Sequence, residues 1–563
     1  MPGVAGVVLF ALPAAGESAA GMLDDHADIQ RHQAQTLDAQ RDRAGQRPDV
    51  LSADWASSET AAQALRFPVE TPCFDLRSII WQGERPTIAL RHQAETALGA
   101  CVGGKGLKAL QTQLTAGLIE RGRVTASVLV PRQSLRHGQL TLRYLPGRIS
   151  AVKGDSKTGW WRTVVPTGPG GDLNQRDLDQ TLENMRRLAS QTDARINITP
   201  GETLGESDII IQPGTGKRWH GYIGGDNSGL RSIESYQTYA GLSLDSPLFL
   251  YDLLSVSWGS NAGWRDHDSN TRAGSVSYSL PFGYWTFFAS AGKSTYHQAL
   301  AGFSAPVIYG GVTKQLQAGL SVVPYRGSSY KGSASLTLLR KRASSSLNDV
   351  PIDVQRRDVT GYELAYEHRH YVGRTVLDIG AGIRGTLRRF SDQPGVAHDE
   401  PGWNGRTTIL AANAGVYIPF HALGQTFSYQ TSWQIQHART PIVPVDYFTI
   451  GGRYTVRGFD GQMMLAAEDG WSIRNDFSLN LDPLIHAPGH QAYTGLDAGR
   501  TGGPLVKYLS GRTLVGAVVG VRGRFDVPYG KVGYDISAGR PLSKPGTLKT
   551  ASTVYSLALM LEI

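Results

Sequence analysis

The C-terminal part of the chain alternates hydrophobic and small polar residues with a period of two. From about residue 214 onward no helical periodicity remains, and Leu254, Val256 and Trp258 alternate with serine and glycine. Turn and loop signals separate such runs throughout this region. A period of two predicts β-strands with one apolar and one polar face. At about 22 residues per strand and connection, residues 214–563 allow about 16 strands.

The alternation is clearest at the end of the chain. One face of a final strand would carry Tyr555, Leu557, Leu559, Leu561 and Ile563. The intervening positions hold Ser556, Ala558, Met560 and Glu562. We therefore expect a terminal strand whose apolar face is continuous.

Residues 71–148 show helical as well as strand periodicity. Four leucines recur on one helical face, at Leu107, Leu110, Leu114 and Leu118. Gly122 follows them and would end this helix. With a shorter helix before it and strands on either side, the pattern predicts one compact unit in the order β-α-α-β-β.

Residues 149–213 predict a second unit with the same β-α-α-β-β order. Asn174 is a suitable N-cap, and a helix with one apolar face follows it. Strands are expected at residues 194–199 and 208–212, with a Pro-Gly turn between them. Two small α+β units in tandem therefore precede the strand-rich region.

The N-terminal residues have three different compositions. Residues 1–20 contain an apolar core of signal-peptide length followed by small residues, and we expect them to be a signal peptide. They lack a basic start, so either the true start lies upstream or the segment is disordered. Residues 21–46 form helix readily yet have almost no apolar face, which suits a helix in water or in a polar cavity, or else a disordered leader. Residues 47–70 hold prolines and small polar residues and are expected to be a linker.

Composition restricts the class of protein without deciding it. The chain of 563 residues has no apolar run of about 18 residues or more, so we expect no transmembrane helix. Its 67 glycines and 23 tyrosines fit many strands, tight turns and interfacial aromatics, as in a membrane barrel or a soluble all-β protein. The net charge is +8, but the basic residues are scattered and form no recognition motif, so we expect no nucleic-acid partner.

The candidate motifs for catalysis and cofactor binding each lack a residue that the motif requires. The segment ending in Gly292-Lys293-Ser294 has Phe287 where a phosphate-binding loop needs its leading glycine. His368 and His370 would share one face of a strand, but no further metal ligand follows at a recognisable spacing. We expect no enzymatic activity, no cofactor and no metal site.

The most informative segment is the glycine-rich stretch 448–461. It contains Val456, Arg457, Gly458 and Phe459, and the segment 470–475 follows it. An arginine in such a setting makes sense if the loop folds into a polar cavity and a carboxylate holds the guanidinium. A second Val-Arg-Gly, centred on Arg522, has no matching flanks and is interpreted as part of a strand.

This segment resembles the conserved long loop of the two-partner secretion (TpsB) transporters, which are outer-membrane barrels of the POTRA-barrel superfamily. The tandem units resemble POTRA domains, on the strength of residues 121–125, 146–149 and 173–178. The terminal alternation resembles the signal read by the barrel-assembly machinery, which usually ends in Phe and here ends in Ile563.

The resemblance implies a mostly β fold and a domain order. It predicts a 16-stranded transmembrane antiparallel β-barrel over residues 214–563, preceded by POTRA domains at 71–148 and 149–213 and by a plug helix at 21–46. In this family a carboxylate on a barrel strand pairs with the loop arginine. Carried over, that carboxylate is Asp497, on the strand face shared by Tyr493 and Gly495.

The resemblance also implies a function. The protein would capture an unfolded exoprotein in the periplasm and pass it through the barrel to the cell surface without ATP. The partners would be a large secreted adhesin, haemolysin or growth-inhibition toxin, the outer-membrane lipid, and the barrel-assembly machinery during insertion. The alternatives are a factor that inserts barrel proteins into the membrane, an outer-membrane enzyme and a passive porin.

Only two cysteines occur, Cys73 and Cys101, both in the first α+β unit. In an exported protein they would form a single disulfide. Two free, buried thiols are the alternative.

Overall fold

The computed structural model describes residues 67–154, 159–229, 235–263, 270–300, 307–392, 406–442, 446–485, 489–509 and 511–563. The expected signal peptide, plug helix and most of the linker lie outside these residues. No helix among the described residues is long and apolar enough to cross a membrane.

Sixteen antiparallel strands close into a barrel. Successive strands pair with each other, and the last strand pairs with the first, so that Leu559 lies opposite Gly225. The barrel strands are β9 (Trp219–Asp226), β10 (Gln237–Asp245), β11 (Leu253–Asn261), β12 (Asn270–Phe282), β13 (Trp285–Leu300), β14 (Val307–Arg326), β15 (Tyr330–Leu347), β17 (Arg357–Val372), β18 (Thr375–Thr386), β19 (Thr408–Ala422), β20 (Gln425–Ala438), β23 (Asp469–Asn480), β24 (Gln491–Gly502), β25 (Thr513–Val527), β26 (Gly530–Ser543) and β27 (Val554–Glu562).

The connections between these strands contain short elements. They are β16 (Val350–Pro351), β21 (Phe448–Ile450), β22 (Leu465–Ala467), α6 (Asp482–Ile485) and the 3-10 turns η4 (Asp353–Gln355), η5 (Arg388–Phe390) and η7 (Pro504–Tyr508). β16 extends only the tip of β15, which pairs directly with β17.

The alternation in sequence becomes the two faces of the barrel wall. On β27, Tyr555, Leu557 and Leu559 are 73%, 38% and 47% exposed, so their apolar side chains point outward. On β24 the outward Leu496 neighbours the fully buried Asp497, which points inward. An apolar outside and a polar inside are what a membrane barrel requires. The predicted barrel of 16 antiparallel strands is confirmed.

The first α+β unit contains β1 (Phe74–Asp75), β2 (Ser78–Gly83), α2 (Ile88–Glu95), β3 (Cys101–Val102), α3 (Gly104–Glu120), β4 (Ser127–Leu129) and β5 (Gln139–Leu145). Its sheet has the order β2-β5-β4, and β1 pairs separately with β3. The leucines of α3 pack with Leu140 and Leu142 in one buried cluster. Gly122 follows α3 with φ +81°, a conformation that glycine adopts without strain.

The second unit contains β6 (Arg148–Gly154), η2 (Trp161–Thr163), α4 (Gln175–Arg186), η3 (Ala189–Gln191), β7 (Arg195–Pro200) and β8 (Glu206–Gln212). The expectation of two helices here is wrong, because a 3-10 turn, η2, replaces the first. The segment that follows η2 contains Pro166, Pro169 and three glycines, which disfavour a helix. The side chain of Asn174 caps α4 as expected, by accepting from the Arg176 N–H at 2.9 Å.

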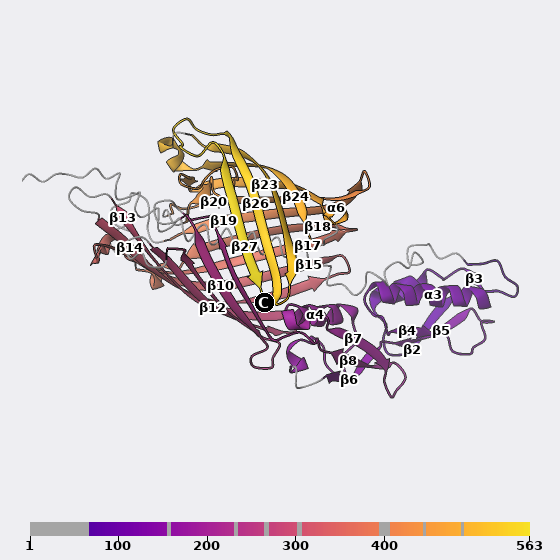
Figure 1. Ribbon diagram of the computed structural model, residues 1–563. Helices are drawn as coiled ribbons and strands as arrows, with labels where there is room; N and C mark the ends of the chain where they lie inside the picture. The colour runs from indigo at the N-terminus through magenta and orange to yellow at the C-terminus, as the bar shows by residue number, and fades with distance from the viewer. Residues whose placement is uncertain are drawn as a thin grey trace, which may run out of the picture.

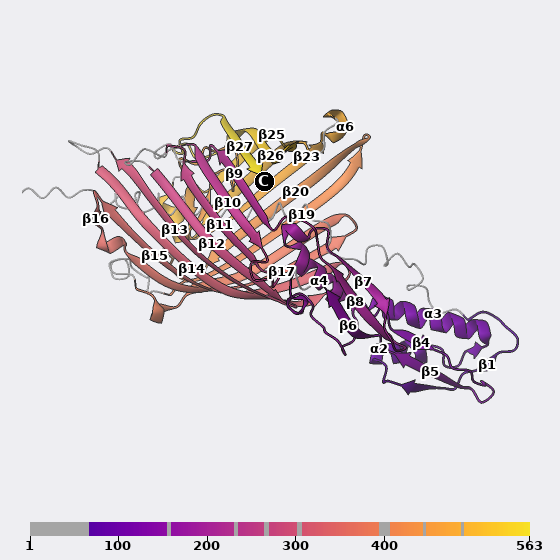
Figure 2. The same cartoon turned by 60° about the horizontal axis from the view of Figure 1, so that its bottom comes forward.

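The two units extend from one end of the barrel (Figure 1). The second unit lies against the barrel, and the first lies beyond it (Figures 1 and 2). They are joined by an ion pair between Arg123 and Asp172 and by the Gln175 N–H, which donates to the carbonyl of Gly122 at 2.7 Å.

Candidate functional site

The connection between β20 and β23 folds back inside the barrel. Its two arms form the short β21–β22 hairpin, and residues 451–464 form the tip. The hairpin and tip share a small apolar cluster with the start of β25 and with the β26–β27 connection, made of Phe448, Ile450, Val456, Phe459, Leu465, Leu514 and Leu548. Val456 is fully buried and Phe459 is 2% exposed, so the loop tip has a core of its own.

Arg457 at the tip is held by Asp497 on β24. The guanidinium Nε lies 2.6 Å from one carboxylate oxygen of Asp497, and Nη2 lies 2.8 Å from the other. The Arg457 backbone N–H donates to the same carboxylate at 3.0 Å. Asp497 is 0% and Arg457 7% exposed, so this two-pronged pair is shielded from bulk water. The structure brings together the two residues that the resemblance paired.

A second carboxylate contacts Arg457, and sequence reasoning missed it. Asp476 on β23 lies 2.6 Å from the Arg457 Nη2, and the carbonyl of Asn475 accepts from the same nitrogen at 3.1 Å. The segment 470–475, which was part of the motif considered above, ends one residue before this aspartate. A polar residue on the inward face of β23 was the signal that could have identified it.

Glycines let the loop lie flat on the barrel wall. A Cβ atom at Gly495 would lie 2.4 Å from Nη2 of Arg457, so only glycine leaves room for the guanidinium. Gly458 has φ +93°, and a Cβ there would lie 2.5 Å from the carbonyl oxygen of Arg540. These positions fit the expected roles of Gly458 as the turn and Gly495 as the space for the loop.

Tyr493 and Arg522 lie beside the Arg457–Asp497 pair. The Tyr493 hydroxyl donates to Asp535 at 2.7 Å, and the Arg522 guanidinium lies 4.8 Å from the centre of the Tyr493 ring. Arg522 is on β25, as expected from its sequence. However, its Nη1 lies 3.4 Å from Asp476, so it shares a carboxylate with the loop arginine.

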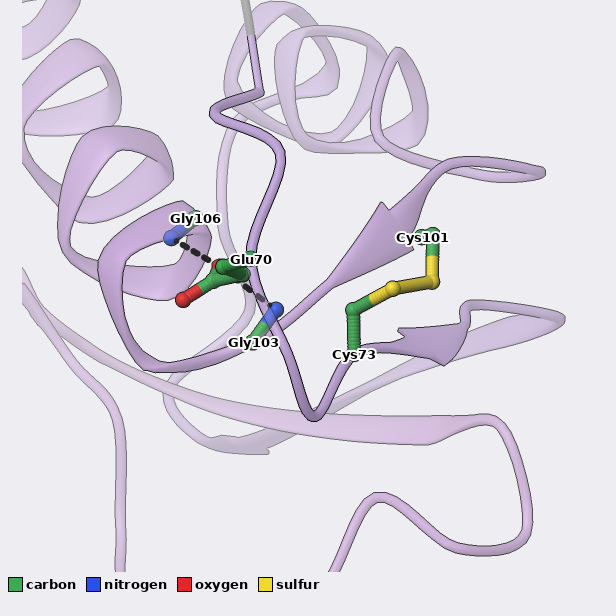
Figure 3. The surroundings of a disulfide bond; sticks show 5 residues. All are labelled: Glu70, Cys73, Cys101, Gly103 and Gly106. Carbon is green, nitrogen blue, oxygen red and sulfur yellow. Dashed lines mark hydrogen bonds between the residues drawn. A yellow bond between two sulfur atoms is a disulfide. The ribbon is translucent and has the colours of Figure 1, made fainter.

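The other sequence-identified residues lie elsewhere. Cys73 and Cys101 form a disulfide next to the paired β1 and β3 (Figure 3). The apolar residues of β27 face outward, and Ile563 follows the strand, where its N–H donates to the Gly221 carbonyl at 2.8 Å. The described residues contain no group of three His, Cys, Asp or Glu side chains that could hold a metal.

Comparison with known proteins decides the family. Residues 205–523 match the family described as haemolysin secretion/activation protein ShlB/FhaC/HecB. Residues 74–147 match the ShlB-type POTRA domain, and residues 148–200 match a further POTRA domain. The chain belongs to this family of two-partner secretion transporters. It is an outer-membrane barrel with its POTRA domains in the periplasm.

Relatives in this family match most of the chain. The chain is 33% identical over 549 residues to the outer membrane transporter CdiB-2 of Burkholderia pseudomallei, covering 94% of this chain and 92% of that one. It is 28% identical to the hemolysin transporter protein ShlB of Serratia marcescens, covering 79% and 78%. The solved structure of CdiB from Escherichia coli superposes with a TM-score of 0.84 at 25% identity, covering 96% and 99%.

Proposed function

We propose that this transporter captures a large secreted protein unfolded in the periplasm and passes it through the barrel as an extended chain, without ATP. The relatives named as CdiB and hemolysin transporters support a cargo of the growth-inhibition toxin or haemolysin class. The observation that carries the proposal is the Arg457–Asp497 anchor. This ion pair holds the β20–β23 loop inside the barrel lumen, through which an exported chain would pass.

Capture is proposed at the open edge of the second POTRA sheet. The order β6-β8-β7 places β7 at an edge, and its residues Asn197 and Ile198 are exposed. An edge strand offers unpaired backbone groups to an incoming strand. Main-chain pairing suits an unfolded client, because it needs no fixed side-chain pattern.

Proline substitutions test this edge. Along a strand, successive N–H groups point to opposite sides, so Asn197→Pro and Ile198→Pro each remove a donor on a different side. One should abolish cargo binding and the other should disturb the pairing of β7 with β8. Asn197→Ala and Ile198→Ala are the matched controls. If both proline variants bind and export cargo normally, capture occurs elsewhere.

Independence from ATP is tested with purified components. The transporter in proteoliposomes should move denatured cargo to a protease-protected compartment without nucleotide. A requirement for added ATP would overturn this part of the proposal. The energy would come from folding on the far side, which removes unfolded chain from the equilibrium.

Residues 21–46 are proposed to plug the lumen, and they lie outside the described residues. The support is their polar, helix-forming sequence, which suits a polar cavity. Deleting them should raise single-channel conductance in planar bilayers while export continues. Unchanged conductance would count against the plug.

A further inference from the structure

Helix α4 of the second POTRA domain has two buried faces of opposite character. Its apolar face, with Leu178 and Met185, belongs to the core of its own domain. Its other face carries Gln180 and Asn184, each only 3% exposed although polar. Buried polar groups are costly unless they are bonded, so this face must have partners.

Those partners are the periplasmic turns of the barrel. The Asn184 amide donates to the Gly283 carbonyl of the β12–β13 turn at 2.8 Å. Arg187, directly after α4, donates to the Tyr251 carbonyl of the β10–β11 turn at 2.6 Å. Burial lowers the pKa of Arg187 to about 10, which still leaves it charged at neutral pH.

The adjoining ends of β14 and β15 supply the third contact, through the charged side chains of Arg326 and Lys331. Glu183 binds the Nη1 of Arg326 at 2.5 Å and also the ammonium of Lys331. The Arg326 side chain is only 3% exposed. Burial raises the pKa of Glu183, but the two cations outweigh it and lower the pKa to about 2, so the carboxylate is charged at neutral pH.

An apolar contact adds to these polar ones, and together we call the contacts of α4 and Arg187 with the barrel the joint. Tyr251, from the β10–β11 turn, is 1% exposed and packs into the core of the POTRA domain with Val164 and Leu188. All these contacts fall on the β10–β15 side of the periplasmic mouth, where α4 lies against the ends of these strands (Figure 2).

We propose that this joint fixes the second POTRA domain on the β10–β15 side of the mouth, so that cargo enters past the β17–β26 side, and that Glu183 is its central positioning residue. Only the part about the side on which cargo enters rests on the export function proposed above; the fixed position of the domain does not depend on it. Without Glu183, the cations of Arg326 and Lys331 would repel each other at a partly buried contact. The domain would then swing instead of unfolding, because the core of α4 is untouched.

The orientation of the domain is the first readout. Spin labels at Glu202→Cys in the domain and Arg374→Cys in the exposed β17–β18 turn can be attached while the native disulfide stays oxidised. The full-length protein should give one narrow distance distribution, and Glu183→Gln should broaden it. Asp208→Asn, which removes an exposed ion pair with Lys153 in the same domain, is the matched control and should leave it narrow.

A rescue variant tests whether Glu183 acts by positioning the domain or whether its charge is needed for another reason. The triple variant Glu183→Gln, Arg326→Met and Lys331→Met removes the whole cluster, and neutral replacement of a buried ionic cluster is often tolerated. It should restore the narrow distribution. Lys331→Gln alone is a second, milder variant, which should broaden the distribution less than Glu183→Gln.

Export is the second readout, at matched levels of folded barrel. Glu183→Gln should lower the export rate about tenfold, the effect of roughly 1.4 kcal/mol, without changing cargo binding to the POTRA domains. A narrow distribution in Glu183→Gln would overturn the joint. A broad distribution with normal export would overturn the positioning role. If the unaltered protein exports no cargo, the proposed function is refuted. The spin-label distances would still show whether Glu183 fixes the position of the domain.

Discussion

The carbonyl oxygen of Arg457 rests against Gly516, so closely that a Cβ atom at position 516 would lie 1.9 Å from it. The loop that carries the arginine is therefore in direct backbone contact with β25. A side chain at position 516 would therefore have to displace the loop or bend β25, because the atom it would meet belongs to the backbone. The anchor depends on the absence of one methyl group as much as on the ion pair.

Gly516→Ala is expected to displace the loop while Arg457 and Asp497 remain intact. The barrel should still form, because the outward face of β25 is unchanged. Export at matched outer-membrane levels should fall, and protease access to the loop should rise. Gly533→Ala on β26 is the control, since its Cβ would meet nothing closer than 3.9 Å. Equal export by the two variants would contradict the close contact.

Arg457→Lys should export poorly although it keeps the charge. A lysine ammonium lacks the planar fork that reaches both oxygens of Asp497 and also Asp476. Arg457→Ala should be worse, because losing one partner of a buried pair costs about 3–5 kcal/mol. Phe459→Ala should also impair export by opening the apolar cluster at the tip. Cargo release from cells measures each effect, and normal release from Arg457→Ala would show that the loop anchor is not functional.

Arg522→Ala should reduce export less than Arg457→Ala. Arg522 contacts the shared Asp476 only at 3.4 Å, whereas Arg457 also binds Asp497. The sharing predicts non-additivity, since Asp476 keeps one cation in each single variant. In a double-mutant cycle with Arg457→Ala, which leaves Asp476 without either arginine, the combined loss should exceed the sum of the two losses. Strict additivity would mean that the two arginines act independently.

The disulfide between Cys73 and Cys101 should stabilise the first POTRA domain. Closing a loop with a sequence separation of 28 residues is worth about 3.6 kcal/mol in the chain-entropy model. Thiol labelling of the denatured, unreduced protein should find no reactive thiol. Two labelled cysteines would refute the bond.

Glu70 should make the same domain sensitive to acid. Its carboxylate accepts from the N–H groups of Gly103 and Gly106 (Figure 3). It also accepts from the N–H of Lys105, and so caps α3 from the preceding segment. These bonds, first that of Gly106, lower the pKa of Glu70 from 4.5. Since the folded pKa is the lower one, the stabilisation is present above pH 4.5 and is lost as the pH falls below that value.

Glu70→Gln removes the charge and should speed hydrogen exchange in the first turn of α3 at neutral pH. It should also remove the part of the acid sensitivity that Glu70 causes, as followed by thermal unfolding. Glu95→Gln, at an exposed pair with His92, is the control and should change neither. Unaltered exchange in Glu70→Gln would show that the cap does not hold α3.

Local patterns in the sequence carried much of the architecture. The alternation that ends in Tyr555, Leu557 and Leu559 predicted outward-facing strands, because adjacent side chains of a strand lie on opposite faces. The leucines of α3 predicted its buried face for the corresponding reason in a helix. The second POTRA domain is where the pattern failed, because prolines and glycines after η2 outweighed its likeness to the first.

By itself, the sequence determined the strand-rich barrel, the two preceding units and the unusual arginine at Arg457, since these follow from periodicity and motif. Only the tertiary structure decided that Arg457 is shared between Asp497 and Asp476, that Gly516 leaves space for the loop, and that Glu183 binds two barrel cations. The physical reason is distance along the chain. Glu183 and Arg326 are separated by 143 residues, and no local pattern encodes which distant side chains barrel closure brings together.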